Sequence, residues 1–285
     1  MKILIQILQG YFSFFFGLLS LHASDIKYVR LNPASEMRRA ELFVWIPEQA
    51  VKSVLVFCPG HNGVGRGFVE DLHWRAFARK HHMALCGLSF ASDYDLTRQG
   101  KGYSHVERGS GKLLLDGLDE IFKGRKLPLF LYGYSAGARF TASFVAWKPD
   151  RLLGWCASGV GRWPDLPANE FKAIPSGIVA CGEYDAVCYW SSLNYFQRAR
   201  KQGRRWTWLS LENLGHGYSK TLDGYVRSSI KHLCGGTSLE KKGVWFDLDT
   251  KNALSGVQSR NNPEFSVWVP QDDHLIRLWK KNHHP

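Results

Sequence analysis

Short continuous hydrophobic runs alternate with segments of helical periodicity along most of this chain. The runs hold four to eight residues and are typical of strands buried on both faces; they are residues 53–58, 83–90, 127–132, 152–157, 178–181 and 206–211. Apolar residues spaced three or four apart mark amphipathic helices at about residues 68–80, 114–122, 189–201 and 222–233, and directly after residue 137. This alternation predicts an α/β fold with a mostly parallel central sheet and helices on both faces.

Two strand-like runs, at residues 27–31 and 41–46, precede the first helix. Strands that follow each other without a helix between them fit an antiparallel edge on the sheet. The connections after residue 90 and between residues 157 and 178 are too short for a separate domain. We therefore expect no large cap and a single catalytic domain over residues 24–234.

The N-terminus differs from this pattern. Lys2 and the apolar run at residues 11–21 are followed by LHASD. A positive residue, an apolar stretch and a small residue at the cleavage point are typical of an export signal. We interpret residues 1–23 as a signal peptide and expect a secreted or periplasmic protein, with an uncleaved membrane anchor as the alternative.

Residues 235–285 follow the last predicted helix and contain three tryptophans. That many large aromatic side chains is unusual for a free linker, so we expect this extension to pack on the main domain. A short helix is predicted to begin near Asp272 or Asp273, where an acidic side chain can cap it.

Net charge and cysteine content limit which binding partners, disulfides and metal sites we expect. The formal net charge of +12 allows association with an anionic envelope surface, although a solvated basic surface is the favoured interpretation. The basic residues are scattered and no nucleic-acid-binding module is present, so no nucleic acid is expected. Four of the six cysteines lie in predicted strands, and only Cys188 and Cys234 are placed to pair. No CxxC spacing occurs, so a zinc ribbon is unsupported. Neither a metal nor a cofactor is expected.

Residues 133–137 read GYSAG, which has the G-x-S-x-G pattern of a nucleophile elbow. A serine on a sharp strand-to-helix turn needs Gly133 and Gly137 because larger side chains would collide with the neighbouring chain. The pentapeptide alone has a sizeable chance rate. Its position directly after a hydrophobic strand and before a helical pattern favours Ser135 as a nucleophile.

A serine hydroxyl needs a base and the base needs an orienting acid. Asp185 follows the strand at residues 178–181, and His216 follows the strand at residues 206–211. The order Ser135, Asp185, His216 therefore places three residues of the right types at the carboxyl edge of the sheet, where open α/β sheets bind ligands. Glu183 is the rival acid, and Asp185 as a simple helix cap is the structural alternative.

The turn at residues 59–63, PGHNG, is placed to supply half of an oxyanion hole. One donor is expected to be the backbone N–H of Ala136. The other is expected to be the backbone N–H of His61, with Asn62 as the alternative. The His61 side chain as the base is a further alternative. The histidine pairs at 81–82 and 283–284 are interpreted as surface residues.

On the segments PGHNG, GYSAG, GEYD and LGHGY, the chain resembles the α/β-hydrolase family over about residues 27–233. It looks most like secreted serine esterases of the dienelactone-hydrolase, polyester-depolymerase and feruloyl-esterase kind. The resemblance implies an α/β-hydrolase fold and hydrolysis of a carboxylic ester through an acyl-enzyme. The continuation Asn62-Gly63 departs from the longer glycine run of that family.

The function predicted from these features is that of an exported serine hydrolase acting on an ester-bearing small molecule or polymer. The candidate substrate contacts are Asn62, Trp163, Tyr184 and Tyr218, although packing explains the aromatic ones nearly as well. Two alternatives stay open: a serine peptidase or amidase of the same fold, and a hydrolase-like binding protein without turnover.

Overall fold

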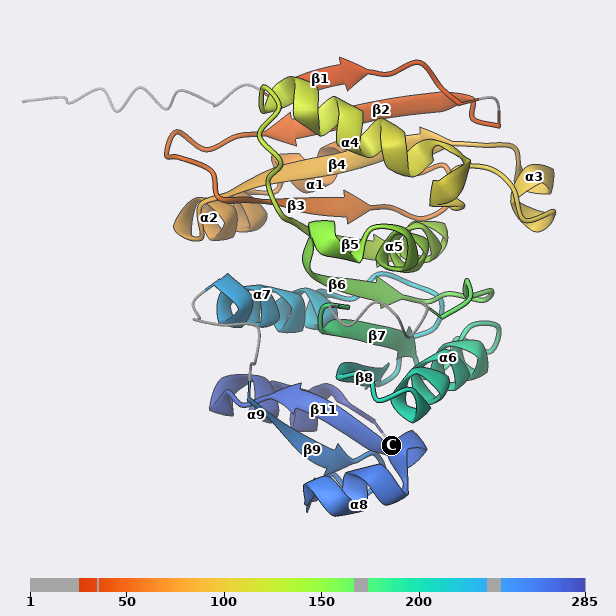
Figure 1. The fold of residues 1–285 in the computed structure, drawn as a ribbon, viewed down its shortest axis with the longest axis vertical. Helices are drawn as coiled ribbons and strands as arrows, with labels where there is room; N and C mark the ends of the chain where they lie inside the picture. The colour runs from red at the N-terminus through yellow and green to blue at the C-terminus, as the bar shows by residue number, and fades with distance from the viewer. Residues whose placement is uncertain (1–25, 35, 167–173, 235–241, 285) are drawn as a thin grey trace, which may run out of the picture.

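The computed structural model describes residues 26–34, 36–166, 174–234 and 242–284 (Figure 1). The predicted signal peptide, residues 1–23, lies outside these ranges. Within them, no helix is both long enough and apolar enough to cross a bilayer.

Eight strands form the main sheet in the order β1-β2-β4-β3-β5-β6-β7-β8. Their bounds are β1 Lys27–Arg30, β2 Arg39–Trp45, β3 Ser53–Cys58, β4 Met83–Ala91, β5 Leu129–Tyr134, β6 Leu152–Ser158, β7 Gly177–Gly182 and β8 Trp206–Leu211. β1, β2 and β4 pair antiparallel, and the other neighbours pair parallel. The predicted parallel sheet with an antiparallel edge is confirmed.

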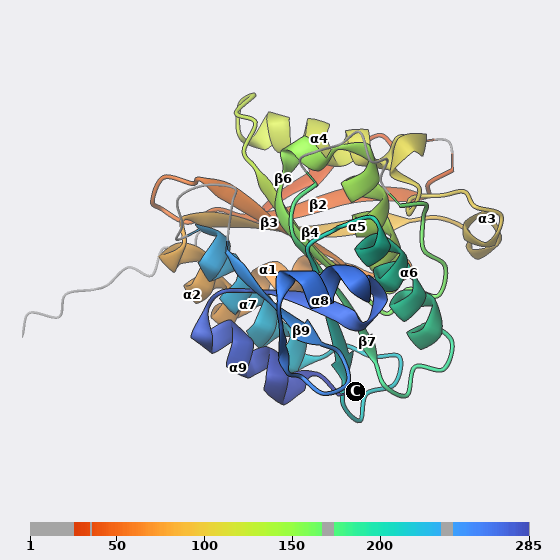
Figure 2. The ribbon, with the colours of Figure 1, turned by 60° about the horizontal axis from the view of Figure 1, so that its bottom comes forward.

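Helices cover both faces of this sheet (Figures 1 and 2). One face carries α4 Ser110–Ile121, α5 Ala136–Trp147 and α6 Tyr189–Lys201, and the other carries α1 Arg66–Glu70, α2 Leu72–Lys80 and α7 Lys220–Cys234. Short helices occur in the connections, namely α3 Tyr94–Arg98 and the 3-10 turns Val106–Arg108 and Pro149–Arg151. Every residue of β4, β7 and β8 is buried, because helices lie over both faces. This explains why these strands read as continuous hydrophobic runs.

The single helix predicted for residues 68–80 is wrong in one respect, because it is two helices. Asp71 separates α1 from α2 and adopts an extended backbone conformation with ψ of 120°. Its carboxylate accepts a hydrogen bond from the backbone N–H of Trp74 at 2.9 Å and so caps α2. The hydrophobic spacing continues across this break, and spacing alone therefore predicted one helix.

The C-terminal extension forms a second, three-stranded sheet of β9 Gly243–Asp247, β10 Ala253–Leu254 and β11 Ser266–Pro270, with α8 Gly256–Asn261, the 3-10 turn Pro263–Phe265 and α9 Asp273–Asn282. It lies against the β8 edge of the main sheet (Figure 1). Thr207 Oγ1 donates a hydrogen bond to the carbonyl of Trp268 at 2.9 Å, and Trp279 Nε1 donates to the carbonyl of Trp208 at 2.8 Å. The helix predicted near residue 272 is confirmed: the Asp272 carboxylate caps α9.

His283 contradicts its interpretation as a surface residue, because only 3% of it is exposed. Its ring stacks on Trp279 with 5.0 Å between ring centres. Nε2 donates to the carbonyl of Leu248 at 2.9 Å, and Nδ1 accepts the backbone N–H of Ser210 at 3.3 Å. These two contacts define a neutral ring. Burial lowers the pKa of His283 to about 4.

This buried ring predicts a loss of stability in acid. The pKa is about 4 in the folded protein and 6.5 for an ordinary histidine, so the unfolded chain binds more protons between these values. The stabilisation is complete above pH 6.5 and is lost as the pH falls toward 4, by up to about 3 kcal/mol. Urea unfolding of the wild type and of His283→Gln between pH 7.5 and 4 measures it. A glutamine amide can keep both hydrogen bonds without titrating, so the variant should lose less stability on acidification. His274→Gln, at an exposed position, should behave like the wild type, and equal losses in all three proteins would contradict the assignment.

Candidate active site

Ser135 lies at a sharp turn between β5 and α5, as the GYSAG pattern predicts. Its backbone angles are φ 54° and ψ −121°, a conformation that residues other than glycine rarely adopt. Its backbone N–H donates to the carbonyl of Ser158 on β6 at 2.9 Å, which anchors the turn to the sheet. Ser135 precedes α5, but its hydroxyl does not cap the helix, so this hydroxyl is available to another partner.

Two glycines allow the turn to form. A Cβ atom at Gly137 would lie 2.0 Å from the carbonyl oxygen of Cys58, and one at Gly133 would lie 2.4 Å from the carbonyl oxygen of Gly137. Both separations are far below van der Waals contact. The turn therefore packs main chain against main chain, and any larger residue at either position would push it apart.

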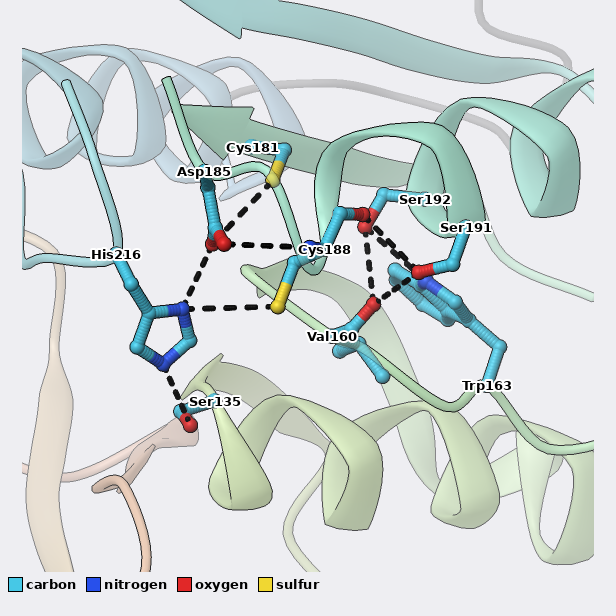
Figure 3. A network of polar contacts seen from close by, with 9 residues as sticks. All are labelled: Ser135, Val160, Trp163, Cys181, Asp185, Cys188, Ser191, Ser192 and His216. Atoms are coloured by element: carbon cyan, nitrogen blue, oxygen red, sulfur yellow. Dashed lines mark hydrogen bonds and ion pairs between the residues drawn. The ribbon is translucent and has the colours of Figure 1, made fainter. Parts of the chain in front are cut away.

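His216 and Asp185 meet Ser135 in a chain of hydrogen bonds (Figure 3). His216 Nε2 lies 3.0 Å from Ser135 Oγ, and His216 Nδ1 lies 2.7 Å from Asp185 Oδ2. Three residues from three separate strand ends are thus brought together at the carboxyl edge of the sheet. The arrangement is consistent with a ring that is protonated on Nδ1, where the carboxylate accepts, and can accept the serine proton on Nε2.

Asp185 is 3% exposed, and its carboxylate is held on several sides. Oδ1 accepts the backbone N–H of Cys188 at 3.2 Å, and the Cys181 thiol donates to Oδ2 at 3.7 Å. These contacts fix the carboxylate toward the imidazole. The backbone of Asp185 also accepts the N–H of Tyr189 at 2.8 Å, so the residue joins the start of α6 as well as meeting His216.

Cys188 and Cys234, the two cysteines placed to pair, form no disulfide. Cys188 is a buried free thiol, and its sulfur lies 3.6 Å from His216 Nδ1 (Figure 3). Burial, reinforced by the nearby Asp185 carboxylate, raises the pKa of the Cys188 thiol to about 12. Sequence reasoning missed this contact. The available signal was the spacing of three residues between Asp185 and Cys188, which can bring two side chains to one side of a turn.

The rival acid and rival base lie elsewhere. Glu183 Oε2 accepts the backbone N–H of Asn213 at 3.2 Å, and Oε1 lies 3.2 Å from His284 Nδ1. The His61 ring packs edge-on to Tyr94 and more nearly parallel to Tyr103. Burial lowers the pKa of His61, which favours a neutral ring. Among the described residues, neither side chain has a hydrogen bond or an ion pair with Ser135.

The PGHNG turn lies beside the nucleophile, since a Cβ at Gly60 would be 3.6 Å from Cβ of Ser135. The backbone N–H of Asn62 donates to Tyr103 Oη at 3.3 Å, so it is already occupied. The backbone N–H of His61 has no acceptor among the described residues. The N–H of Ala136 is the first of α5 and has none within the helix. Within the described residues, the backbone N–H groups of His61 and Ala136 are thus the two donors beside Ser135 that have no acceptor.

Asn62, a candidate substrate contact, supports this turn through its side-chain oxygen and its backbone carbonyl. It adopts a φ of 55°, and its side-chain oxygen accepts the backbone N–H of Ser92 at 3.0 Å. Its carbonyl accepts a hydrogen bond from the Arg39 guanidinium at 2.7 Å. Sequence reasoning did not single out Arg39 or Tyr103, because their hydrogen bonds to the turn join residues more than twenty positions apart and form only in the tertiary structure.

The three aromatic candidates have different surroundings. Tyr218 donates to the buried carboxylate of Asp223 on α7, which Tyr132 also reaches at 2.9 Å. This contact ties the His216 loop to a helix, so Tyr218 has a structural role. The Trp163 ring stacks on Tyr195 with 4.2 Å between ring centres. Packing therefore explains Trp163 as well.

Tyr184 is 65% exposed and lines a groove on the same edge of the sheet. The groove has a volume of about 750 Å³ and lies between α6 and the C-terminal extension. Its other exposed aromatic residues are Trp190 and Phe265. Tyr184 and Ala186, on either side of Asp185, form part of its wall, so the groove adjoins the loop of the candidate acid.

Comparisons with known proteins agree with this architecture. No family model matches the chain, and no curated protein matches its sequence. Among solved structures, a poly(3-hydroxybutyrate) depolymerase from Bordetella parapertussis superposes with a TM-score of 0.54 at 16% identity, covering 76% of this chain and 93% of its own. An S-formylglutathione hydrolase from Staphylococcus aureus gives 0.53 at 16% identity, covering 74% and 100%. An esterase from Pyrobaculum calidifontis gives 0.53 at 13% identity, covering 75% and 88%. Together with the sheet order, these likenesses identify the fold of this chain as the α/β-hydrolase fold.

Proposed function

We propose that this protein is an exported serine hydrolase that cleaves carboxylic esters through an acyl-enzyme on Ser135. One observation carries the proposal: the unbroken contact chain from Ser135 Oγ to His216 and Asp185, built on a strained turn. Strain of that kind is retained where the surrounding structure enforces it, and it is common at active sites. The predicted signal at residues 1–23 supports export.

In the proposed reaction, His216 Nε2 takes the Ser135 proton as the hydroxyl oxygen attacks the ester carbonyl. Asp185 stabilises the imidazolium that forms and keeps its orientation. The negative charge that develops on the carbonyl oxygen is met by the N–H groups of Ala136 and His61, near the N-terminus of α5. His216 then gives its proton to the departing alcohol, and water attacks the acyl-enzyme by the same steps in reverse.

An ester is the preferred substrate class for two reasons. The solved structures of similar fold include proteins named as an esterase and a polyester depolymerase. The groove beside the Asp185 loop is lined mainly by apolar and aromatic residues and by none of the three candidate catalytic residues, so it could hold an uncharged ester chain only beyond the reacting group. A peptidase is the second candidate because the same three residues can cleave amides.

A substrate panel tests this proposal. The protein without residues 1–23 should hydrolyse p-nitrophenyl esters from acetate to palmitate, and methyl ferulate extends the panel to aryl acids. We expect kcat/KM for the preferred ester to exceed that for a peptide anilide by at least about a hundredfold, because the amine of an anilide is a poorer leaving group than the alcohol of an ester. Labelling by a fluorophosphonate probe reports an activated serine without any assumption about the substrate. Labelling with preferential anilide cleavage would favour the peptidase, and no labelling would favour a binding protein.

A further inference from the structure

Asp185 and Cys188 lie next to Nδ1 of His216, the ring nitrogen that faces away from Ser135 (Figure 3). All three side chains are of types that bind metal ions. The donor atoms of Asp185, Cys188 and His216 all lie within 4.8 Å of one another. His216 Nδ1 is 2.7 Å from Asp185 Oδ2 and 3.6 Å from Cys188 Sγ. The proposed reaction uses the first contact and assigns no role to the thiol. The three donors combine an imidazole, a carboxylate and a sulfur, a set that zinc prefers.

The distances suit a tetrahedral zinc ion. With Zn–N of about 2.05 Å and Zn–S of about 2.3 Å, the nitrogen and sulfur of such a site are separated by about 3.5 Å. The observed separation is 3.6 Å. Nitrogen and carboxylate oxygen need about 3.3 Å, so the 2.7 Å between His216 Nδ1 and Asp185 Oδ2 must open by about 0.6 Å. The His216 side chain is 44% exposed, which leaves its ring room for that movement.

The charges also balance. Asp185 and Cys188 are 3% and 4% exposed, and two buried negative groups would be unfavourable alone. A divalent cation bound to one carboxylate, one thiolate and a neutral imidazole forms a cluster of zero net charge. The metal itself displaces the thiol proton, as it does for coordinating cysteines generally. Burial therefore opposes a bare thiolate at Cys188 but not a zinc-bound one.

We propose that Asp185, Cys188 and His216 form an inhibitory binding site for Zn²⁺ or a similarly thiophilic divalent cation. The thiol proton leaves to solvent, and the imidazole proton moves from Nδ1 to Nε2 as Nδ1 binds the metal. The ring then presents an N–H to Ser135 and has no lone pair to take the serine proton. Asp185 also loses its hydrogen bond with His216 Nδ1, because both groups now bind the metal. The metal site stands on its own geometry, whereas its effect on turnover rests on the proposed ester hydrolysis.

The donor set predicts which ions act. Thiolate and imidazole ligands select zinc over magnesium and calcium, which prefer oxygen ligands. Micromolar Zn²⁺ should inhibit ester hydrolysis and fluorophosphonate labelling, EDTA should restore both, and millimolar Mg²⁺ should have no effect. In Cys188→Ser, measured against its own metal-free rate, the Zn²⁺ concentration for half-inhibition should rise at least about tenfold.

Binding is measured separately from activity with Co²⁺, whose bond to a thiolate gives a charge-transfer absorption band in the near ultraviolet. Both proteins for this experiment carry Cys234→Ser, which removes the exposed cysteine. The band should appear in Cys234→Ser and be absent from Cys188→Ser/Cys234→Ser, and Zn²⁺ should displace it.

The outcomes separate the two proposals. A cobalt–thiolate band that depends on Cys188, in a protein that hydrolyses no ester, would support the metal site and refute the ester hydrolase. Ester hydrolysis with no such band would refute the metal site alone. Inhibition by Zn²⁺ that is equally strong in Cys188→Ser would also refute it, because the ion would then act elsewhere.

Discussion

Replacing Ser135 with alanine is expected to abolish ester hydrolysis and fluorophosphonate labelling together. The kcat should fall by about five orders of magnitude or more, as in other triads that lose their nucleophile. The remaining rate comes from the oxyanion donors and substrate binding, which the substitution leaves in place. Intact-protein mass spectrometry after exposure to the probe gives a direct readout, because the probe forms a stable phosphonyl adduct only with an activated serine.

Two further variants make this result specific. Ser191→Ala removes a nearby hydroxyl that donates to the carbonyl of Val160 at 2.6 Å, and it should retain full labelling. Ser135→Gly should be as inactive as the alanine variant but more stable by about 1 kcal/mol, since glycine tolerates the positive φ of this turn. Labelling of Ser135→Ala at the wild-type level would show that another residue is the nucleophile.

Asp185→Asn should lower kcat by about three to four orders of magnitude while leaving the fold intact. The amide is nearly the same size as the carboxylate and can still accept the backbone N–H of Cys188. Its NH₂ group, however, donates to Nδ1 of His216 and fixes the opposite tautomer. Nε2 then carries the proton and cannot act as a base. Because the loss concerns the transition state, kcat and kcat/KM should fall together.

The matched control is Glu183→Gln, two residues away on the same loop. Glu183 contacts Asn213 and His284, and no contact joins it to His216 in the described structure. Removing its charge should change kcat by no more than about threefold, because solvent screens a charge that does not contact His216. A larger loss in Glu183→Gln than in Asp185→Asn would overturn the assignment of the acid.

The main sheet could be predicted from the sequence because its strands are buried on both faces. The runs at residues 53–58 and 206–211 coincide with β3 and β8, since hydrophobic content alone marks such strands. The break at Asp71 was not predicted, because a capping residue can interrupt a helix without disturbing its apolar spacing. The small sheet of β9, β10 and β11 was missed as well. Its edges depend on contacts with β8 that local pattern does not encode.

Some residues of the candidate site could also be predicted from the sequence, and others could not. Ser135, Asp185 and His216 could be singled out because each follows a recognisable strand, and parallel strands end at one edge. The position of Cys188 could not, since a loop cysteine reads equally well as a disulfide partner until its neighbours are known. His283 was misread for a similar reason. Its position beside another histidine near the C-terminus resembles a surface pair, whereas tertiary packing buries it on Trp279.

The main-chain contacts around Gly133 and Gly137 bear on how this pentapeptide would change over evolutionary time. Both glycines are required by the close approach of backbone segments, whether or not the serine reacts. A descendant that abandoned catalysis would be free to replace Ser135, and would gain stability if glycine took its place, but it would still need Gly133 and Gly137 to fold. Finding both glycines of G-x-S-x-G in a related protein would therefore indicate a shared fold, and only the central serine would indicate the proposed reaction.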